Sequence, residues 1–458
     1  MATKSKLQYV CTECGWQTSK WVGRCGECQS WGTVVEAGAP QGIRHTAKAI
    51  TPGTPAQPIT DVSTQASTKE PTGVSELDRV LGGGLVPGVV VLLAGEPGVG
   101  KSTLLLDVAA RAAARARENG YAEVLYVTGE ESASQVRSRA ERIGGLDPHL
   151  LLASESDLQR ILGHIQATQP SLLILDSIQT IADPEVEGSA GGVSQVRAVA
   201  TAVINIAKAS GMPVVIVGHV TKDGSIAGPR TLEHLVDVVC HFEGDRHSRL
   251  RLVRAVKNRY GATDEVGCFE LTDSGIRGLE DPSGLFISSR SSTVPGTCVT
   301  VTLEGRRPMP VEVQALSVIA AGPPRRTTAG VDSSRVAMML AVLQSRMGIR
   351  FEKQDIFVST IGGARAMEPA VDCAIALALA STALDLPMPP GVVALGEVSL
   401  TGELRPVVDL QQRINEASRL GFRIAIIPDA AEITKVPAGM EIRRVKDVRS
   451  AAQSVLPL

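Results

Sequence analysis

The sequence predicts a three-part chain whose central part is an α/β domain built on a parallel sheet. Between residues 69 and 285, apolar strand-like runs alternate with amphipathic helical runs, which is the pattern of parallel strands joined by helices. Four cysteines fall within residues 1–36, and residues 37–68 are rich in Ala, Pro, Gly and Thr, as a flexible linker is. Helices and strands mix again in residues 286–458, which predicts a separate α+β domain.

Length and charge limit the classes of protein to consider. At 458 residues the chain is long enough for two or three domains. A net charge of −2 means that any nucleic-acid contact has to come from locally clustered Lys and Arg. No apolar run approaches the roughly 18 residues of a membrane span, and the first residues lack the apolar core of a signal peptide. We therefore expect a cytoplasmic protein with no membrane partner.

Apolar periodicity places the expected elements. In the central domain we expect strands at residues 89–94, 124–128, 172–175, 214–218, 236–242 and 249–255, with helices at 103–117, 134–143 and 195–209. In the last domain we expect strands at 298–304, 311–320, 355–360, 392–397 and 424–427, with helices at 334–348, 369–383 and 410–420.

The four N-terminal cysteines have the spacing of a zinc site. Cys11, Cys14, Cys25 and Cys28 form C-x2-C-x10-C-x2-C, and two such turns complete a tetrahedron of thiolates around Zn²⁺. So short a module cannot fold on apolar burial alone, so metal binding would supply the folding energy. A redox dithiol is the alternative, but the surrounding βαβ pattern that it needs is missing.

Aromatic and basic residues accompany these cysteines. The residues Trp16, Lys20, Trp21, Arg24 and Trp31 suit a surface that stacks on bases and contacts phosphates. They suit the core of the module equally well, and its small size favours the core.

A glycine-rich stretch marks the predicted nucleotide site. The segment GEPGVGKST fits G-x-x-x-x-G-K-[ST] and lies between an apolar run and a helix-like run. In such a loop the backbone N–H groups surround a phosphate, Lys101 reaches the β- and γ-phosphates, and Ser102 offers its hydroxyl to Mg²⁺. The residues predicted to bind ATP are Gly95, Glu96, Pro97, Gly98, Val99, Gly100, Lys101, Ser102 and Thr103.

Polar side chains follow three later strands of the predicted sheet. Glu130 and Glu131 come after the run 124–128, where a carboxylate can orient and deprotonate an attacking water. Glu130 is the first choice, and Glu131 stays open. Asp176 closes the apolar run LLIL, as the Asp that binds the Mg²⁺ shell does. His219 ends the run 214–218, where it either senses the γ-phosphate or is an ordinary polar strand end.

Taken in order, these motifs resemble those of the RecA-like ATPases. The series is TGVSELDRVLGGG, GEPGVGKST, VTGEES, LLILDSIQT and GHVTKDG. The motif KNRYG at 257–261, the cysteine ribbon in front and the domain behind make the chain similar to the RadA (Sms) family of bacterial recombination and repair ATPases. That family has KNRFG, so Tyr260 replaces a phenylalanine here and keeps the aromatic ring.

The resemblance implies a ring, expected to be a hexamer, with nucleotide held between subunits. Lys257 or Arg259 would then enter the neighbour's site and stabilise charge in the transition state. The resemblance also implies an activity on single-stranded and branched DNA together with RecA, in which the protein promotes branch migration. Two segments rich in Gly and small residues, 183–193 and 221–230, resemble the mobile DNA loops of such proteins; plain surface loops are the alternative.

The last domain resembles the Lon protease domain, whose Ser–Lys dyad is missing here. Ala370 follows Pro369 where the family has its serine, and Gln411 and Arg413 occupy the candidate lysine positions. An arginine stays protonated and cannot act as a general base. We therefore expect no peptidase activity, although an ATP-dependent protease or chaperone remains an alternative function. A nucleotide-switched scaffold that does not bind DNA is another.

Overall fold

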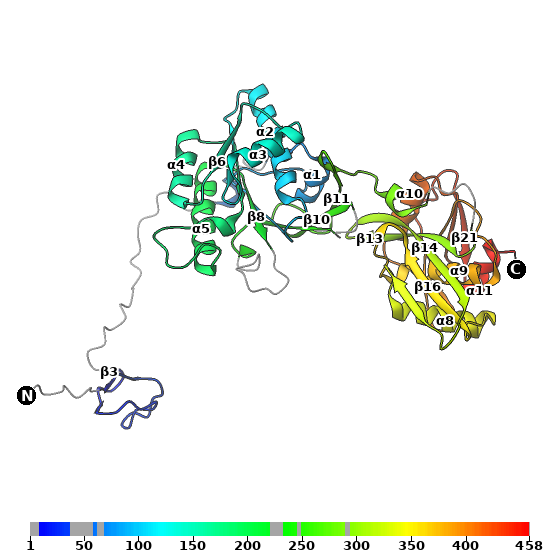
Figure 1. The fold of residues 1–458 in the computed structure, drawn as a ribbon. Coiled ribbons are helices and arrows are strands. Elements are labelled where there is room, and N and C mark those ends of the chain that lie inside the picture. The colour runs from blue at the N-terminus through cyan, green and yellow to red at the C-terminus, as the bar shows by residue number, and fades with distance from the viewer. Residues whose placement is uncertain are drawn as a thin grey trace, which may run out of the picture. The chain divides into compact units, whose positions relative to one another are not determined.

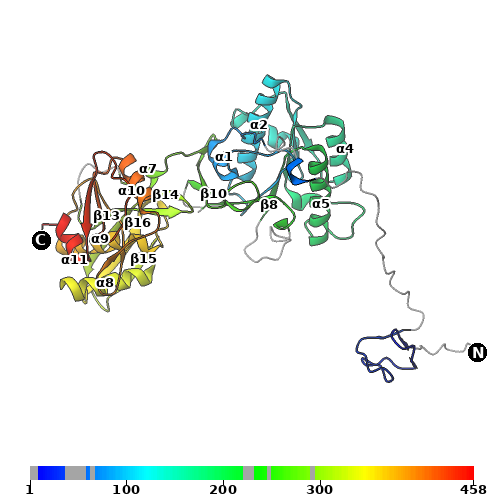
Figure 2. The ribbon, with the colours of Figure 1, turned by 180° about the vertical axis from the view of Figure 1, so that it is seen from behind.

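The computed structural model of the chain describes residues 9–36, 58–61, 68–219, 232–244, 249–288 and 294–457. The chain divides into two compact units, Met1–Ser63 and Thr64–Leu458. The second unit contains two large sheets, each with its own helices, and Figures 1 and 2 show them from opposite sides.

The first unit contains a small antiparallel sheet of three strands. They are β1 (Tyr9–Cys11), β2 (Gln17–Thr18) and β3 (Val34–Glu36), in the order β2-β1-β3, and a short 3-10 turn η1 (Ile59–Asp61) follows. The buried apolar cluster consists of Cys11, Cys25 and Val34. Three residues bury too little apolar surface to hold a fold together.

Nine strands form the central sheet, in the order β12-β11-β10-β9-β4-β8-β7-β5-β6. The six strands from β9 to β6 are parallel, and β10, β11 and β12 extend the sheet in antiparallel fashion. The strands are β4 (Val90–Gly95), β5 (Val124–Thr128), β6 (Leu150–Ser154), β7 (Leu172–Asp176), β8 (Val214–His219), β9 (Val238–Glu243), β10 (Leu250–Asn258), β11 (Val266–Thr272) and β12 (Gly275–Gly278). The helices are α1 (Ser75–Leu81), α2 (Lys101–Asn119), α3 (Ala133–Arg142), α4 (Leu158–Thr168) and α5 (Val193–Ser210), with the 3-10 turn η3 (Ile178–Thr180).

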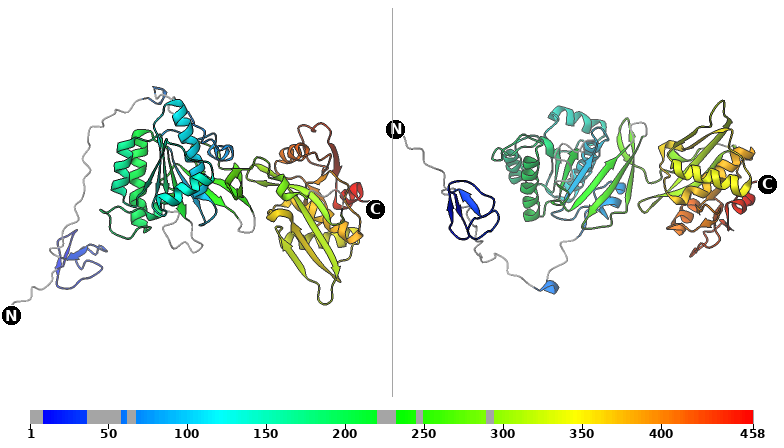
Figure 3. Two further views of the ribbon diagram at one scale, coloured as in Figure 1. Left: turned by 45° about the horizontal axis from the view of Figure 1, so that its top comes forward. Right: turned by 90° about the horizontal axis from the view of Figure 1, so that it is seen from below.

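Strand β4 is buried on both faces, as the central strand of a parallel sheet has to be. Val91 and Leu93 pack into the cluster that contains residues of α1, α2 and α3. Leu92 and Ala94 point to the other face and pack with α4 and α5. Figure 3 shows the helices covering both faces of this sheet. Because these strands are parallel, their carboxyl ends lie together at one edge of the sheet, between the two layers of helices.

Seven strands form the second sheet, in the order β15-β16-β14-β13-β17-β20-β21. They are β13 (Thr297–Glu304), β14 (Arg307–Ile319), β15 (Arg326–Ala329), β16 (Gln354–Thr360), β17 (Val392–Ala394), β20 (Ile424–Pro428) and β21 (Glu441–Val445), and β18 (Glu397–Val398) pairs separately with β19 (Leu404–Arg405). The helices are α7 (Ser283–Phe286), α8 (Ser333–Met347), α9 (Asp372–Leu384), α10 (Leu410–Arg419) and α11 (Val448–Val455), with the 3-10 turns η4 (Ile361–Gly363) and η5 (Pro369–Val371). Residues of α8, α9 and α11 share one apolar cluster and α10 packs into another.

The observed elements agree with the expected fold class, and every strand and helix expected in the central domain is present within a few residues. The central domain also has α1, α4, β6, β11 and β12, which were not expected from the sequence. In the last domain, the expected helix 369–383 begins as the short turn η5, and the run 392–397 is split between β17 and β18. Among the described residues, no helix is both long and apolar enough to cross a membrane.

An ion pair between a buried arginine and a partly buried glutamate joins α10 to the second sheet. The Arg413 side chain is 1 % exposed, and its two terminal nitrogens donate to the two carboxylate oxygens of Glu368 at 2.7 and 2.8 Å. Arg413 also donates to Val301 O at 2.6 Å and to Val408 O at 3.0 Å. Burial disfavours the charged form of Glu368, but the bonds and charge of Arg413 outweigh it and lower the pKa of this carboxyl.

Removing one partner of this pair should destabilise the fold. We expect Glu368→Gln to cost about 3 kcal/mol, because it leaves the buried Arg413 without its counter-charge. The pair of Arg443 with the exposed Glu441 gives a matched control, and Glu441→Gln should leave the stability close to that of wild type. Thermal unfolding at pH 7 compares the two variants.

The pH dependence of this contribution follows from the lowered pKa. A carboxyl with a depressed folded-state pKa stabilises the fold above its unfolded pKa, and the contribution is lost as the pH falls below the usual Glu value of 4.5. The difference between wild type and Glu368→Gln should therefore shrink in acid. Equal stabilities at pH 7 would contradict this account of the pair.

Candidate functional site

The phosphate-loop segment joins β4 to α2 at the carboxyl edge of the central sheet. The strand ends at Gly95 and the helix begins at Lys101. A side chain at Gly95 would not fit, because its Cβ would lie 2.4 Å from the carbonyl oxygen of Phe242 on β9. Gly98 and Gly100 have φ angles of 81° and 108°, which favour glycine. The loop therefore ends with the positive end of a 19-residue helix directed at this edge.

Lys101 is buried at the mouth of this loop. Its ammonium group donates to Gly95 O at 2.8 Å and to Glu96 O at 2.9 Å, and it lies 3.2 Å from Nδ1 of His219. Burial lowers the pKa of Lys101 to about 8, against the opposing effect of Asp176 and Glu130. An anion bound here would stabilise the protonated form.

Asp176 ends β7 beside this lysine and is buried. The hydroxyl of Tyr126, on the neighbouring strand β5, donates to Asp176 Oδ2 at 2.6 Å. Burial together with the negative charge of Asp176 keeps the pKa of Tyr126 well above its usual value, so the tyrosine remains a donor. The contact fixes the carboxylate at the edge where parallel sheets place their ligands.

Glu130 is connected to Lys101 through His219. Glu130 Oε1 accepts from the Ser177 hydroxyl at 2.5 Å and lies 3.1 Å from Nε2 of His219. Because the Lys101 ammonium group can only donate, Nδ1 of His219 accepts and its Nε2 carries the proton that is donated to Glu130. The Lys101 ammonium group, the His219 imidazole and the Glu130 carboxylate therefore form one hydrogen-bonded series. A change of charge at the phosphate loop can act on Glu130 through this series.

Glu131 has a different environment. Its carboxylate forms an ion pair with Arg139 on α3, with the two atoms 2.5 Å apart. The structure thus brings together Lys101, Glu130 and Asp176, and it ties Glu131 to a helix instead.

The KNRYG segment lies at the opposite edge of the same sheet. Strand β10 runs antiparallel to β9, so Asn258 pairs with Val238, and Val238 pairs with Val91 near the start of β4. The phosphate loop follows the other end of β4, about 15 Å away along the strand. Within one chain, the two motifs therefore face away from each other.

Lys257 and Arg259 differ in how firmly they are held. Lys257 donates to Glu233 O at 2.7 Å and to Val236 O at 2.8 Å, and burial with the nearby Arg259 charge lowers its pKa. Arg259 is 56 % exposed, and its guanidinium lies 3.2 Å from a carboxylate oxygen of Asp237. Arg259 is therefore the more accessible cation of the two.

One of the two expected DNA loops is ordered around a glutamine. Gln195 is 2 % exposed, and its amide nitrogen lies within hydrogen-bonding distance of Asp183 O, Val186 O and Gly188 O. Residues 183–192 carry three acidic side chains and no basic one. The other expected loop, 221–230, lies outside the described residues.

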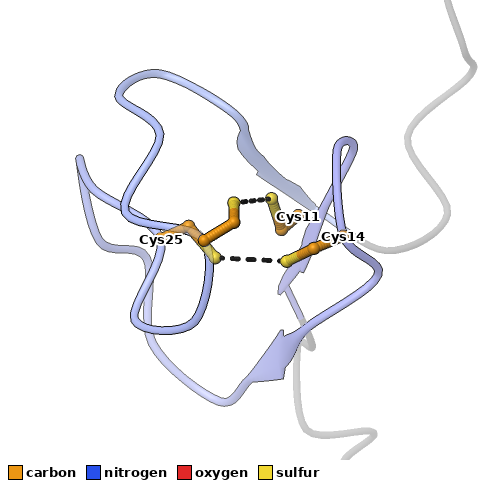
Figure 4. Close-up of side chains that lie close together, drawn as sticks. Cys11, Cys14 and Cys25 are labelled. Carbon is orange, nitrogen blue, oxygen red and sulfur yellow. Dashed lines mark hydrogen bonds between the residues drawn. The ribbon is translucent and has the colours of Figure 1, made fainter.

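The four N-terminal cysteines are gathered in space (Figure 4). All four sulfur atoms lie within 4.8 Å of one another, and the pairs Cys11–Cys28 and Cys14–Cys25 are 3.7 and 3.5 Å apart. Thiolates around a tetrahedral Zn²⁺ at about 2.3 Å are about 3.8 Å apart, so the cluster fits this ion.

A hydrogen bond with the Thr33 side chain lowers the pKa of Cys11 to about 6. Against a backbone hydrogen bond at Trp16, burial and the neighbouring cysteines raise the pKa of Cys14 to about 12. Metal binding would therefore release a proton from the cluster.

Two tryptophans of this ribbon lie at its surface, which corrects the expectation from the sequence that they form its core. Trp16 packs against the buried cysteines, but Trp21 and Trp31 are 65 % and 75 % exposed. The guanidinium of Arg24 lies 5.8 Å from the ring centre of Trp31. Four metal ligands hold so small a module together, which leaves these two rings at the surface.

The positions that correspond to the Lon dyad hold no nucleophile and no lysine. Ala370 is buried, and Arg413 is committed to Glu368. Gln411 is bonded to another loop: its side chain accepts from Thr434 N at 2.8 Å and donates to Lys435 O at 2.8 Å. These contacts stabilise the fold where the protease family has its chemistry.

Sequence reasoning missed three residues beside the phosphate loop. Ser177 follows Asp176 directly, and this position next to a predicted site residue could have marked Ser177 as part of the site. Tyr126 lies one strand away from its partner, and only the strand order reveals the contact. Arg251, on β10, is buried and donates to Val99 O at 3.2 Å, and nothing in the sequence connected these two positions.

This fold and this site define a P-loop ATPase with a RecA-like core, a zinc ribbon in front and a Lon-like domain behind. Three family models match in that order: an AAA domain at residues 55–225, a rubredoxin metal binding domain at 9–36, and the Lon protease (S16) C-terminal proteolytic domain at 329–456.

Similar proteins show the family. The DNA repair protein RadA of Mycolicibacterium smegmatis is 52 % identical over 461 residues, covering 99 % of this chain and 97 % of its own length. The protein of that name from Bacillus subtilis is 42 % identical, covering 99 % of both chains. The chain belongs to the RadA family. A solved structure of the RadB recombinase aligns with 46 % of this chain and 99 % of its own, at 24 % identity and a TM-score of 0.35.

We expect one zinc ion per chain, bound by the four cysteines. Metal analysis of purified protein should show its loss in Cys11→Ser, because three thiolates hold zinc far less tightly than four. Cys240→Ala is the matched control, since Cys240 is buried in the central domain and should leave the zinc content unchanged. Full zinc in Cys11→Ser would contradict this assignment.

Proposed function

We propose that this protein is a Mg²⁺-dependent ATPase that works on single-stranded and branched DNA during recombinational repair. The observation that carries the proposal is the gathering of Lys101, Glu130 and Asp176 at the carboxyl edge of the central sheet. The names of its relatives, which are DNA repair proteins, support the choice of substrate.

The residues at this edge suit defined roles. The loop from Gly95 to Thr103 would hold the phosphates of ATP, with Lys101 against the β- and γ-phosphates. Ser102 and Asp176 would hold Mg²⁺, because hydroxyl and carboxylate oxygens are the ligands that it takes. The ion, when bound, would neutralise negative charge on the phosphates. Glu130 would orient and deprotonate the attacking water, and His219 would connect it to Lys101.

The site would be completed by a second subunit in a ring, which we expect to be a hexamer. Lys257 and Arg259 lie too far from their own phosphate loop to act there, so they would serve the neighbour's loop. The exposed guanidinium of Arg259 suits direct contact with transition-state charge. Lys257, bonded to two carbonyls, would shape the segment that presents it.

The work done on DNA would be branch migration together with RecA. The acidic loop 183–192 is poorly suited to phosphate contact, so the backbone contacts would come from other segments, such as 221–230 with Lys222 and Arg230. The Lon-like domain would act as an assembly scaffold without peptidase activity, since Ala370, Gln411 and Arg413 provide no dyad.

Two neighbouring acids test the hydrolytic role. Glu130→Gln should abolish steady-state ATP hydrolysis while nucleotide affinity stays near wild type, because a carboxamide cannot take the proton from water; general-base catalysis is worth about 10²- to 10⁴-fold. Glu131→Gln is the matched control and should retain most of the turnover, since it only loses the contact with Arg139. If Glu131→Gln abolished turnover and Glu130→Gln retained it, the catalytic role would belong to Glu131.

The proposed DNA activity has its own test. Single-stranded DNA should raise ATP turnover, with an effect that fades as salt rises. In a branch-extension assay with RecA, the wild-type protein should lengthen the exchanged region, and Glu130→Gln should not. If DNA is neither retained at low salt nor stimulates turnover, the scaffold alternative is favoured. ATP-dependent cleavage of an unfolded protein would favour the protease alternative instead.

A further inference from the structure

The β13–β14 hairpin of the Lon-like domain contacts the loop that carries Arg259. Gly305 and Arg306 form the two-residue turn of this hairpin. The backbone N–H of Arg306 donates to Asp264 O at 2.6 Å, and a Cβ on Gly305 would lie 2.1 Å from the same oxygen. Asp264 belongs to residues 259–265, which join β10 to β11 and are called the 259–265 loop below.

Arg307, directly after the turn, fixes the hairpin to the base of this loop. One guanidinium nitrogen forms an ion pair with Glu76 on α1 and donates to Val266 O at 3.2 Å. The other donates to Leu279 O at 3.1 Å and to Glu280 O at 2.6 Å. Arg307 is 7 % and Glu76 1 % exposed, so the pair is shielded from water. Since Val266 is the first residue after the loop, Arg307 holds one of the loop's two ends.

The helix that carries Glu76 supports the rest of the 259–265 loop. Helix α1 ends at Leu81, and a Cβ on the following Gly82 would lie 3.3 Å from Cα of Gly261. The ammonium group of Lys69 donates to both Gly82 O and Tyr260 O, at 2.5 and 2.8 Å. Contacts therefore run without a break from the hairpin through Arg307 and α1 to the KNRYG segment.

A second ion pair secures the same hairpin. Glu304 ends β13 and lies 2.5 Å from the guanidinium of Arg254 on β10, the strand that leads into the loop. The hairpin therefore contacts the strand before the 259–265 loop, the loop itself and the strand after it. Figure 1 shows α1, β10 and β11 on the side of the central sheet where the β13–β14 hairpin lies.

We propose that this hairpin of the Lon-like domain holds the 259–265 loop in the position from which Arg259 acts, which makes Gly305 and Arg307 positioning residues for ATP turnover in the neighbouring subunit. The inference rests on the proposed site between subunits. A catalytic group misplaced by about 1 Å loses on the order of 10²-fold in rate, so support of the loop is required for turnover. The Lon-like domain thus takes part in ATP hydrolysis without supplying a reacting group.

Two variants loosen the hairpin in different ways. Arg307→Lys keeps the positive charge near Glu76 but loses the planar fork that reaches four acceptors. Gly305→Ala keeps every charge and forces the turn away from Asp264. Each should lower kcat about 10- to 100-fold while the affinity for nucleotide changes less than about 2-fold, because the variant subunit's own phosphate loop is intact.

Each variant has a matched control. Arg306→Ala removes an adjacent arginine whose side chain forms an ion pair with the Asp264 side chain at 3.3 Å, and it keeps the backbone bond to Asp264. Both side chains of that pair are about half exposed, and such pairs contribute little, so turnover should stay within about 2-fold of wild type. Gly348→Ala places alanine at a φ of 74°, close to the 61° of Gly305, in a position where a Cβ meets nothing within 4 Å. It therefore reproduces the backbone strain without the displacement of the turn.

Mixing subunits distinguishes positioning from general damage. Lys101→Ala subunits have no working phosphate loop but present an intact 259–265 loop. A mixture of Lys101→Ala with Arg307→Lys, or with Gly305→Ala, should hydrolyse more ATP than the sum of its two proteins assayed separately. A mixture of Lys101→Ala with Arg259→Ala should do the same. If Arg259→Ala is rescued and the hairpin variants are not, the hairpin inference is wrong and the shared site stands. If no mixture is rescued, the shared site itself is wrong, and the inference fails with it.

Discussion

The direction of strand β4 is the constraint on which the site depends. Strand β4 is parallel to β8 and β9, so the phosphate loop at its carboxyl end lies beside His219. The amino end of β4 lies near the start of β9, and the antiparallel strand β10 ends there with the KNRYG segment. The phosphate loop and the KNRYG segment are therefore separated by the length of β4. A chain arranged in this way cannot surround one nucleotide with both motifs, so the arrangement favours a site shared between copies.

Burial gives the carboxyl edge its chemical character. Lys101 is kept from water, so its charge depends on the groups around it, and its pKa of about 8 leaves it responsive to an anion. The series from Lys101 through His219 to Glu130 links the group proposed to contact phosphate to the group proposed to activate water. Tyr126 and Ser177 hold the two carboxylates in place, and both come from neighbouring strands or their ends.

Local patterns in the sequence were sufficient for the strands β4, β5, β7, β8, β9 and β10 and for the cysteine cluster, because each depends on neighbours a few residues apart. The contacts of Tyr126, Arg251 and Arg307 could not be predicted, since each joins elements that meet only after the sheet order is set. The tryptophans show a different limit. Sequence alone does not say whether metal or apolar burial stabilises a small module. The core was therefore favoured over a surface role for Trp21 and Trp31, and both lie at the surface. The antiparallel strands β11 and β12 were missed for lack of a clear period.

The Lon-like domain has Ala370 at the position of the family's serine, and Arg413, at a candidate lysine position, is paired with Glu368. The hairpin of this domain contacts the loop that carries Arg259. The central claim is that ATP is held between two copies of the chain. A structure of the assembled protein with a Mg²⁺–ATP transition-state analogue tests it most directly. We expect the neighbour's Arg259 or Lys257 within hydrogen-bonding distance of the γ-phosphate mimic, opposite Lys101. A nucleotide enclosed by one chain alone, with KNRYG facing solvent, would contradict the account.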